Sequence, residues 1–118
     1  MITVFLHDLR FHAYQGLFDE EHRTGNELVV NLELRYQETE RVHRLDQTIN
    51  YGEVFQIIKT RLKTPGKLLE SLAMDIADDL KNTFPQILEI NISISKLQAP
   101  ILNFQGQPGI RYEKKFDL

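Results

Sequence analysis

The sequence predicts an α+β protein in which two helices cover one face of a four-stranded antiparallel sheet. Apolar residues alternate with a period of two over residues 2–14, 27–36 and 87–96, and a last short strand is expected at about 110–117. Between residues 50 and 84 the apolar period becomes helical. The order strand, strand, helix, helix, strand, strand is typical of proteins whose helices lie together on one side of an antiparallel sheet.

The first predicted strand changes its alternation part-way along. Apolar residues stand at even positions before His7 and at odd positions after Asp8. This slip in parity predicts a β-bulge at these two residues, because one extra residue reverses the side to which later side chains point. The polar, acidic stretch 15–26 contains Gly16 and Gly25 and is expected to be a loop, since it is too long for a tight hairpin turn.

The two predicted helices have start and stop signals. Asn50, three residues before Glu53, resembles a capping arrangement at the start of the first helix, and residues 64–66 (Thr-Pro-Gly) end it. The second helix carries an apolar stripe that begins at Leu69 and repeats at helical spacing. It is expected to stop near Phe84, because the proline that follows disfavours helical geometry at the residue before it.

The outer strands of such a sheet have open edges. An unpaired edge of alternating apolar residues is a liability, and pairing it with another subunit is a common solution. The predicted topology therefore favours a homo-oligomer.

Composition limits the classes of function. The 118 residues fit one domain, residues 1–118. The chain has no cysteine, which excludes disulfides, thiolate nucleophiles and cysteine zinc sites and agrees with a reducing, cytoplasmic location. A net charge of -3 without a long basic run argues against a nucleic-acid partner. No stretch approaches the roughly 18 apolar residues of a membrane span, so no membrane segment or signal peptide is expected.

Lys96 continues the apolar parity of the third strand. It follows four even-numbered apolar residues from Leu88 to Ile94, so its ammonium group points toward the core if the strand reaches it. A lysine is rarely buried without a partner, and burial favours its neutral form, so such a group could exchange protons with a substrate near neutral pH. Alternatively, the strand ends at Ser95 and Lys96 bends into solvent.

Glu70 stands in the first turn of the second helix, beside the apolar stripe. The helix dipole alone favours a carboxylate there. A carboxylate at this place could also accept two parallel hydrogen bonds from a flat N–H and NH₂ edge, such as guanine and pterin rings present. Tyr51 and Glu21 are uninformative alone. A tyrosine at a helix start is usually there for packing, and an acid in a polar loop is usually a solvated charge. The four histidines show no ligand spacing, so no metal site is expected.

Together, several segments resemble the dihydroneopterin aldolases of the folate pathway over essentially the whole chain. They are Tyr14-Gln15-Gly16 followed by Glu21 and Gly25, NYGEVF at 50–55, LLESLA at 68–73 and KLQAPI at 96–101. The resemblance implies the tunnelling fold (ββααββ), a ring-shaped homotetramer or homo-octamer with active sites between subunits, and no cofactor. Gln15 departs from the pattern, since many members have a histidine there, and this puts in doubt any role that needs a titrating imidazole.

The resemblance also implies a reaction and the residues that carry it. The catalytic residues would be Lys96, Tyr51 and Glu21, and the pterin-binding residues Glu70, Asn50 and Leu69. The substrate would be 7,8-dihydroneopterin, cleaved by a retro-aldol reaction into 6-hydroxymethyl-7,8-dihydropterin and glycolaldehyde. The C=N bond of the dihydropterin ring can accept the electrons of the breaking bond, so positioned acid and base groups suffice and no metal is required.

Two other functions stay open on the sequence. An epimerase acting on dihydroneopterin or its triphosphate would use the same residues, and a triphosphate would favour a cationic cluster at the pocket mouth. Arg61, Lys63 and Lys67 are the only local candidates for that cluster. The second possibility is a catalytically silent oligomer that binds pterins or purines through Glu70.

Overall fold

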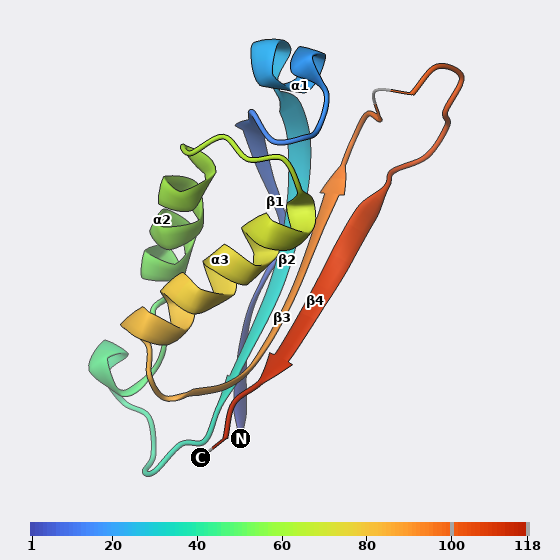
Figure 1. Cartoon of the computed structure of the whole chain (residues 1–118). Helices are drawn as coiled ribbons and strands as arrows, with labels where there is room; N and C mark the ends of the chain where they lie inside the picture. Colours follow the sequence, from blue (N-terminus) through green and yellow to red (C-terminus); the bar gives the residue numbers. More distant parts are fainter. Residues whose placement is uncertain (100, 118) are drawn as a thin grey trace.

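The computed structural model describes residues 1–99 and 101–117 and shows a four-stranded antiparallel sheet in the order β1-β2-β3-β4 (Figure 1). The elements in chain order are β1 (Ile2–Ala13), α1 (Asp19–Thr24), β2 (Asn26–Tyr36), the short 3₁₀-helix η1 (Leu45–Gln47), α2 (Tyr51–Leu62), α3 (Leu69–Thr83), β3 (Ile87–Lys96) and β4 (Gly109–Lys115). The predicted α+β class and order of the main elements are confirmed, with strand ends that differ from the predicted ones by one or two residues.

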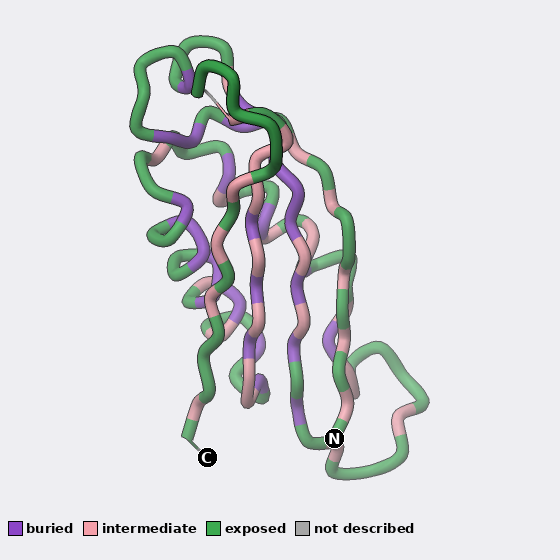
Figure 2. Tube along the Cα trace, turned by 90° about the vertical axis from the view of Figure 1, so that its right-hand side faces the viewer, coloured by how far each residue is buried: buried purple, intermediate pink, exposed green. Residues whose placement is uncertain are grey.

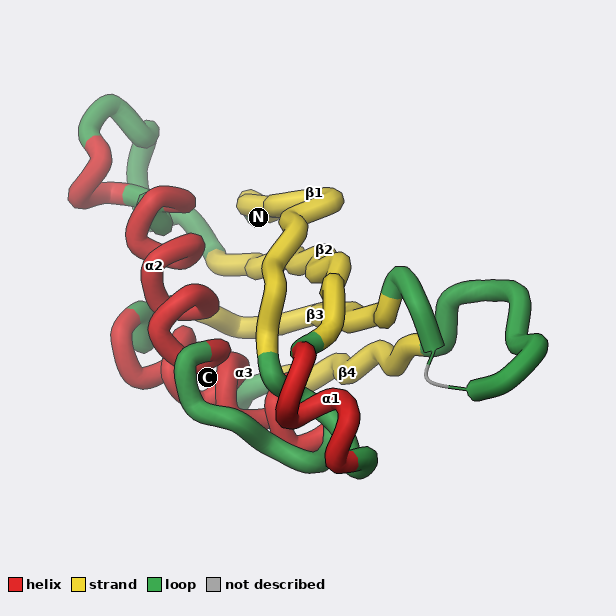
Figure 3. Tube along the Cα trace, turned by 90° about the horizontal axis from the view of Figure 1, so that it is seen from above, coloured by secondary structure: helices red, strands yellow, loops and turns green. Residues whose placement is uncertain are grey.

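Two layers make up the fold. Helices α2 and α3 lie on one face of the sheet, α3 over β3 and β4 and α2 beside β1 (Figures 1 and 3). Both termini lie at one end of the sheet, whereas α1, the start of α3 and the end of β3 lie together at the other (Figure 1). No helix in the described residues is long and apolar enough to cross a membrane.

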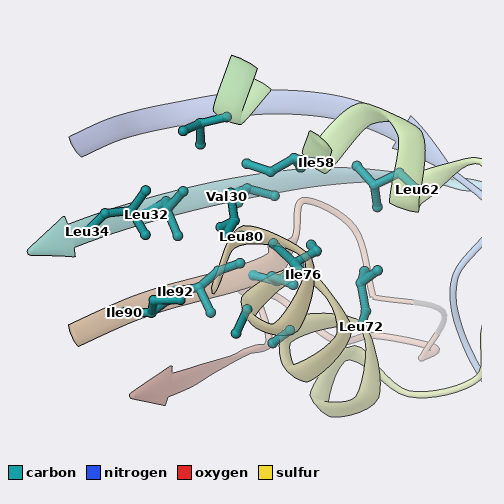
Figure 4. Packing of buried hydrophobic residues seen from close by; sticks show 14 of the residues in the cluster. Val30, Leu32, Leu34, Ile58, Leu62, Leu72, Ile76, Leu80, Ile90 and Ile92 are labelled. Carbon is teal, nitrogen blue, oxygen red and sulfur yellow. The ribbon is translucent and has the colours of Figure 1, made fainter. Parts of the chain in front are cut away.

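The core lies between this sheet face and the two helices. In β2 the even-numbered residues from Asn26 to Tyr36 and also Val29 are buried, and in β3 the buried residues are Ile87, Ile90, Ile92 and Ile94 (Figure 2). The labelled side chains of these strands lie on the side of α2 and α3 (Figure 4). The fully buried residues include Val30, Leu32, Leu34, Ile58, Ile76, Leu80, Ile90 and Ile92. Each such side chain contributes about 1.5–3 kcal/mol when it leaves water, so this layer fixes the sheet on which the functional residues stand.

The predicted bulge in β1 is confirmed. Its register against β2 shifts between Leu6 and Leu9, and Asp8 adopts a left-handed conformation with φ 59°. The Asp8 N–H leaves the ladder and donates to the Asn31 side-chain oxygen at 2.8 Å. The one extra residue lets both halves of β1 place their apolar side chains on the helix side.

The expectation of a simple loop at 15–26 was wrong, because α1 (Asp19–Thr24) forms within it. Its first turn contains three acidic residues and its last turn His22 and Arg23. This distribution of charge complements the helix dipole and favours the helix. The expected cap of α2 is present, since Asn50 Oδ1 accepts a hydrogen bond from the Gly52 N–H at 2.9 Å.

Candidate active site

Strand β3 continues to Lys96, so the alternative in which the strand ends at Ser95 is wrong. The Lys96 N–H donates to the Pro108 carbonyl at 2.9 Å, and Lys96 stands opposite Leu28 in the register with β2. The Lys96 side chain is therefore on the core side, with 14% of its surface exposed. Its ammonium group donates a hydrogen bond to Glu21, whose side chain is 2% exposed. The two residues form an ion pair largely shielded from water.

Glu21 is held by two further donors. The Asn26 side-chain amide donates to Glu21 Oε2 at 2.7 Å, and the Phe18 N–H donates to Glu21 Oε1 at 3.3 Å. Burial raises the pKa of the Glu21 carboxyl, but the hydrogen bonds from Lys96, Asn26 and Phe18 together outweigh it, so its pKa lies below the ordinary value. The carboxylate is thus ionised at neutral pH and fixes the position of the Lys96 ammonium group.

The backbone at Gly16 passes close to the Glu21 carboxylate, and only glycine allows this approach. A Cβ at this position would overlap the Glu21 carboxylate, and the residue has φ +152°, which L-residues rarely adopt. The His22 ring also contacts this turn, with Nε2 2.5 Å from the Gly16 carbonyl. Glycine at this turn therefore allows α1 to place Glu21 next to Lys96, at the end of β3.

The lowered pKa of Glu21 predicts a loss of stability in acid. Its contribution is complete above the unfolded-state pKa of about 4.3 and is lost as the pH falls through the folded-state pKa. The difference in unfolding free energy between wild type and Glu21→Gln should therefore be constant above about pH 5 and shrink as the pH falls below about 4.3. Denaturant titrations at a fixed protein concentration measure it, and a difference independent of pH would contradict the assignment.

A pocket of about 240 Å³ adjoins the ion pair. Its charged lining residues are Glu21, Lys67, Glu70 and Lys96, and the rest of the lining is apolar except for glycine. Leu69 is buried at the start of α3, whereas Glu70, the next residue, is exposed. Apolar walls with a few polar groups are typical of small-molecule sites, and this pocket has that composition.

A sequence model of the dihydroneopterin aldolase family matches residues 4–113 of the chain. A dihydroneopterin aldolase from Streptococcus pyogenes serotype M6 is 35% identical over 119 aligned residues, which cover 98% of this chain and 99% of that protein. This chain belongs to the dihydroneopterin aldolase family.

Solved structures that carry the same family name share the fold. A putative dihydroneopterin aldolase from Vibrio cholerae superposes with a TM-score of 0.86 at 20% identity and 98% coverage of both chains. Escherichia coli dihydroneopterin aldolase in complex with neopterin superposes with a TM-score of 0.84 at 19% identity, covering 97% of this chain and 99% of that one.

In this member of the dihydroneopterin aldolase family, one chain brings together only part of the predicted site. Lys96, Glu21, Glu70 and Leu69 line the same pocket. The other two predicted residues, Asn50 and Tyr51, do not line it. They stand at the start of α2, away from the start of α3 (Figure 1). Tyr51 is 69% exposed, so its ring is available to another molecule.

Sequence reasoning missed Asn26 and Phe18, which hold Glu21. Asn26 had a usable signal, because it shares the even parity of Leu28 and Val30 and therefore points to the core side, where it is 9% exposed. Phe18 acts through its backbone N–H, for which the side-chain pattern gives no signal. In residues 1–99 and 101–117, no group of three or more His, Cys, Asp or Glu residues is arranged to hold a metal ion.

The cationic cluster considered for a triphosphate does not exist as a unit. Arg61 Nε and Nη2 donate to the two Asp79 carboxylate oxygens at 2.8 Å each, in a hollow lined mostly by residues of α2 and α3. Lys63 lines a different hollow beside β1, and only Lys67 lines the candidate pocket. The three side chains line different surfaces, so the other explanation that the sequence allows, a solvated helix end, fits Arg61 and Lys63 better.

Proposed function

We propose that this chain is a dihydroneopterin aldolase that cleaves 7,8-dihydroneopterin into 6-hydroxymethyl-7,8-dihydropterin and glycolaldehyde. The observation that carries the proposal is the shielded Lys96–Glu21 pair in a pocket whose rim bears Glu70. The names of the relatives support it, and the E. coli structure holds neopterin, a molecule with the same ring system.

The pocket can bind and orient the substrate through two kinds of contact. The Glu70 carboxylate would accept two hydrogen bonds from the N–H and NH₂ edge of the pterin, and such charge-assisted pairs are strong and directional. Apolar side chains at the start of α3, Leu68 and Leu69, would pack on the ring. The substrate side chain would then extend toward Lys96, which lines the same pocket from the end of β3.

The reaction needs only proton transfers at defined atoms. The 2′-hydroxyl loses its proton, the C1′–C2′ bond breaks, and its electrons form a C1′=C6 double bond while ring N5 takes up a proton. Glycolaldehyde leaves, and return of a proton from N5 to C1′ gives the hydroxymethyl product. We assign these transfers to Lys96 and Tyr51, acting through water, with Glu21 holding Lys96 at the reacting atoms.

A second copy of the chain would complete the site with Tyr51 and Asn50. The edge strands β1 and β4 run in opposite directions, since all three strand pairings are antiparallel. The β4 edge of one copy can therefore pair with the β1 edge of the next copy in the same orientation. Such a heterologous contact closes into a ring when the rotation between neighbouring copies divides a full turn, and we propose the tetramer or octamer that the family resemblance implies.

Incubation with 7,8-dihydroneopterin and chromatography of the products test the function. Release of glycolaldehyde and 6-hydroxymethyl-7,8-dihydropterin supports the aldolase. Inversion at C2′ alone would replace it with an epimerase, and binding without conversion would replace it with a silent pterin-binding protein.

Mixed oligomers test the shared site. Tyr51→Phe and Lys96→Ala should each have low turnover alone, whereas rings reassembled from both variants should regain activity. Pairing a Lys96 from one copy with a Tyr51 from the next restores one complete site. The control is reassembly of each variant with itself, and mixed rings that stay as inactive as the separate variants would contradict a site built from two copies.

A further inference from the structure

We propose that Gln15 is a positioning residue that fixes the segment leading into α3 and so sets how tightly Glu70 and Leu69 hold the substrate. This inference rests on the proposed pterin site. Gln15 stands where many members of the family have the histidine of a Tyr-His-Gly sequence. The proposal gives the Gln15 side-chain amide a role although it does not line the pocket.

The Gln15 side chain joins the end of β1 to the connection between α2 and α3. It is 1% exposed, and its Nε2 donates to the Thr64 carbonyl at 2.7 Å. The neighbouring Gly16 N–H donates to the Gly66 carbonyl at 2.9 Å, and Gln15 and Gly66 form an isolated parallel bridge. A Cβ on Gly66 would lie 2.8 Å from Gln15 Oε1, so the two segments are closely packed.

The segment held by Gln15 leads directly to the substrate pocket. Only a few residues separate Gly66 from Leu69, where α3 begins, and Leu68, Leu69 and Glu70 all line the pocket. The Leu68 carbonyl accepts from the Leu72 N–H at 3.2 Å, so Leu68 is already tied into the first turn of α3. A shift of the connection would therefore carry the Glu70 carboxylate with it.

Gln15 also contacts the catalytic half of the site, but through its backbone. Its carbonyl accepts from the Asn26 side-chain amide at 2.7 Å, and the same amide donates to Glu21. The side chain of Gln15 serves the Glu70 side of the pocket, whereas its backbone serves the Lys96–Glu21 side. Changing only the side chain should therefore weaken substrate binding and leave the proton-transfer step largely intact.

The geometry requires a donor at this position. The Thr64 carbonyl is an acceptor, and an amide N–H satisfies it at every pH. A histidine can also donate, from one ring nitrogen when neutral, whereas leucine of similar size cannot. The Gln15–Thr64 hydrogen bond is part-buried and Thr64 itself is exposed. In a leucine variant the Thr64 carbonyl loses this partner and can turn to water, so the connection is expected to move with it.

Steady-state kinetics and neopterin binding of Gln15→Leu test the proposal. We expect KM for dihydroneopterin and Kd for neopterin to rise about tenfold, with kcat changed by less than about threefold. Gln15→His should keep both constants close to wild type because it restores a donor. Gln86→Leu, an exposed glutamine outside the pocket lining, is the matched control and should change neither constant.

Gly66→Ala provides a second test that needs no change at Gln15. Its new Cβ presses on Gln15 Oε1, so KM and Kd should rise in the same direction as in Gln15→Leu, and this variant decides the matter if Gln15→Leu does not fold. Folded variants with wild-type KM and Kd, or with a lowered kcat at unchanged KM, would overturn the proposal. A wild-type protein that neither binds neopterin nor cleaves dihydroneopterin would instead overturn the proposed function.

Discussion

Replacement of Lys96 by alanine is expected to lower kcat for dihydroneopterin cleavage by about 10²- to 10⁴-fold, the usual contribution of a positioned acid–base group. Neopterin binding should persist, because the group proposed to hold the ring is Glu70, on α3, and not Lys96, on β3. Single-turnover kinetics together with equilibrium binding separate the two quantities. The expected signature is a large loss in the chemical step at nearly unchanged Kd.

Two further variants make this experiment specific. Lys96→Arg retains a cation that can pair with Glu21, yet a guanidinium does not give up its proton, so turnover should stay low. Lys67→Ala removes the other lysine of the pocket and should leave kcat near wild type. Near wild-type turnover in either Lys96 variant would show that another group moves the protons.

The side of the sheet on which Lys96 lies could be predicted from the sequence because a strand has a strict period of two. The same parity rule located the bulge at His7 and Asp8, and the spacing of apolar residues located both long helices. These features depend on near neighbours along the chain. Side-chain direction within one element is therefore readable without tertiary information.

The partner of Lys96 could not be predicted in this way. Glu21 lies 75 residues away in the chain and reaches the lysine only because Ala13 pairs with Asn26 and Leu28 with Lys96. Those registers place the 15–25 segment over the end of β3. The family resemblance placed both residues in the catalytic set, whereas the residue pattern alone left Glu21 as a solvated acid.

Tyr51 and Asn50 lie away from the pocket of their own chain, and this could not be predicted for a different reason. Their local structure was predicted correctly, with Asn50 as the cap of α2, yet a single chain does not bring them to the pocket. A site divided between copies leaves no trace in the periodicity of one chain. The proposal of a shared site rests on the family resemblance, the two open sheet edges and the exposed Tyr51 ring at the start of α2.

Replacement of Glu70 by glutamine should have the opposite signature to that of Lys96→Ala. An amide offers one acceptor and one donor, so it cannot accept both hydrogen bonds from the N–H and NH₂ edge and instead faces one donor with another. Hydrogen bonds to charged groups contribute about 1.5–3 kcal/mol each. We therefore expect Kd for neopterin to rise by about 100-fold or more, with a matching loss in kcat/KM.

The control for Glu70→Gln is Asp75→Asn, an exposed acid on the same helix that does not line the pocket. Both variants lose one negative charge from α3, so an effect of net charge would appear in both. Unchanged neopterin affinity in Glu70→Gln would mean that the pterin edge is held elsewhere. The start of α3 would then serve only as a wall of the pocket. The Glu70 carboxylate would act only on the stability of α3, through its favourable interaction with the helix dipole.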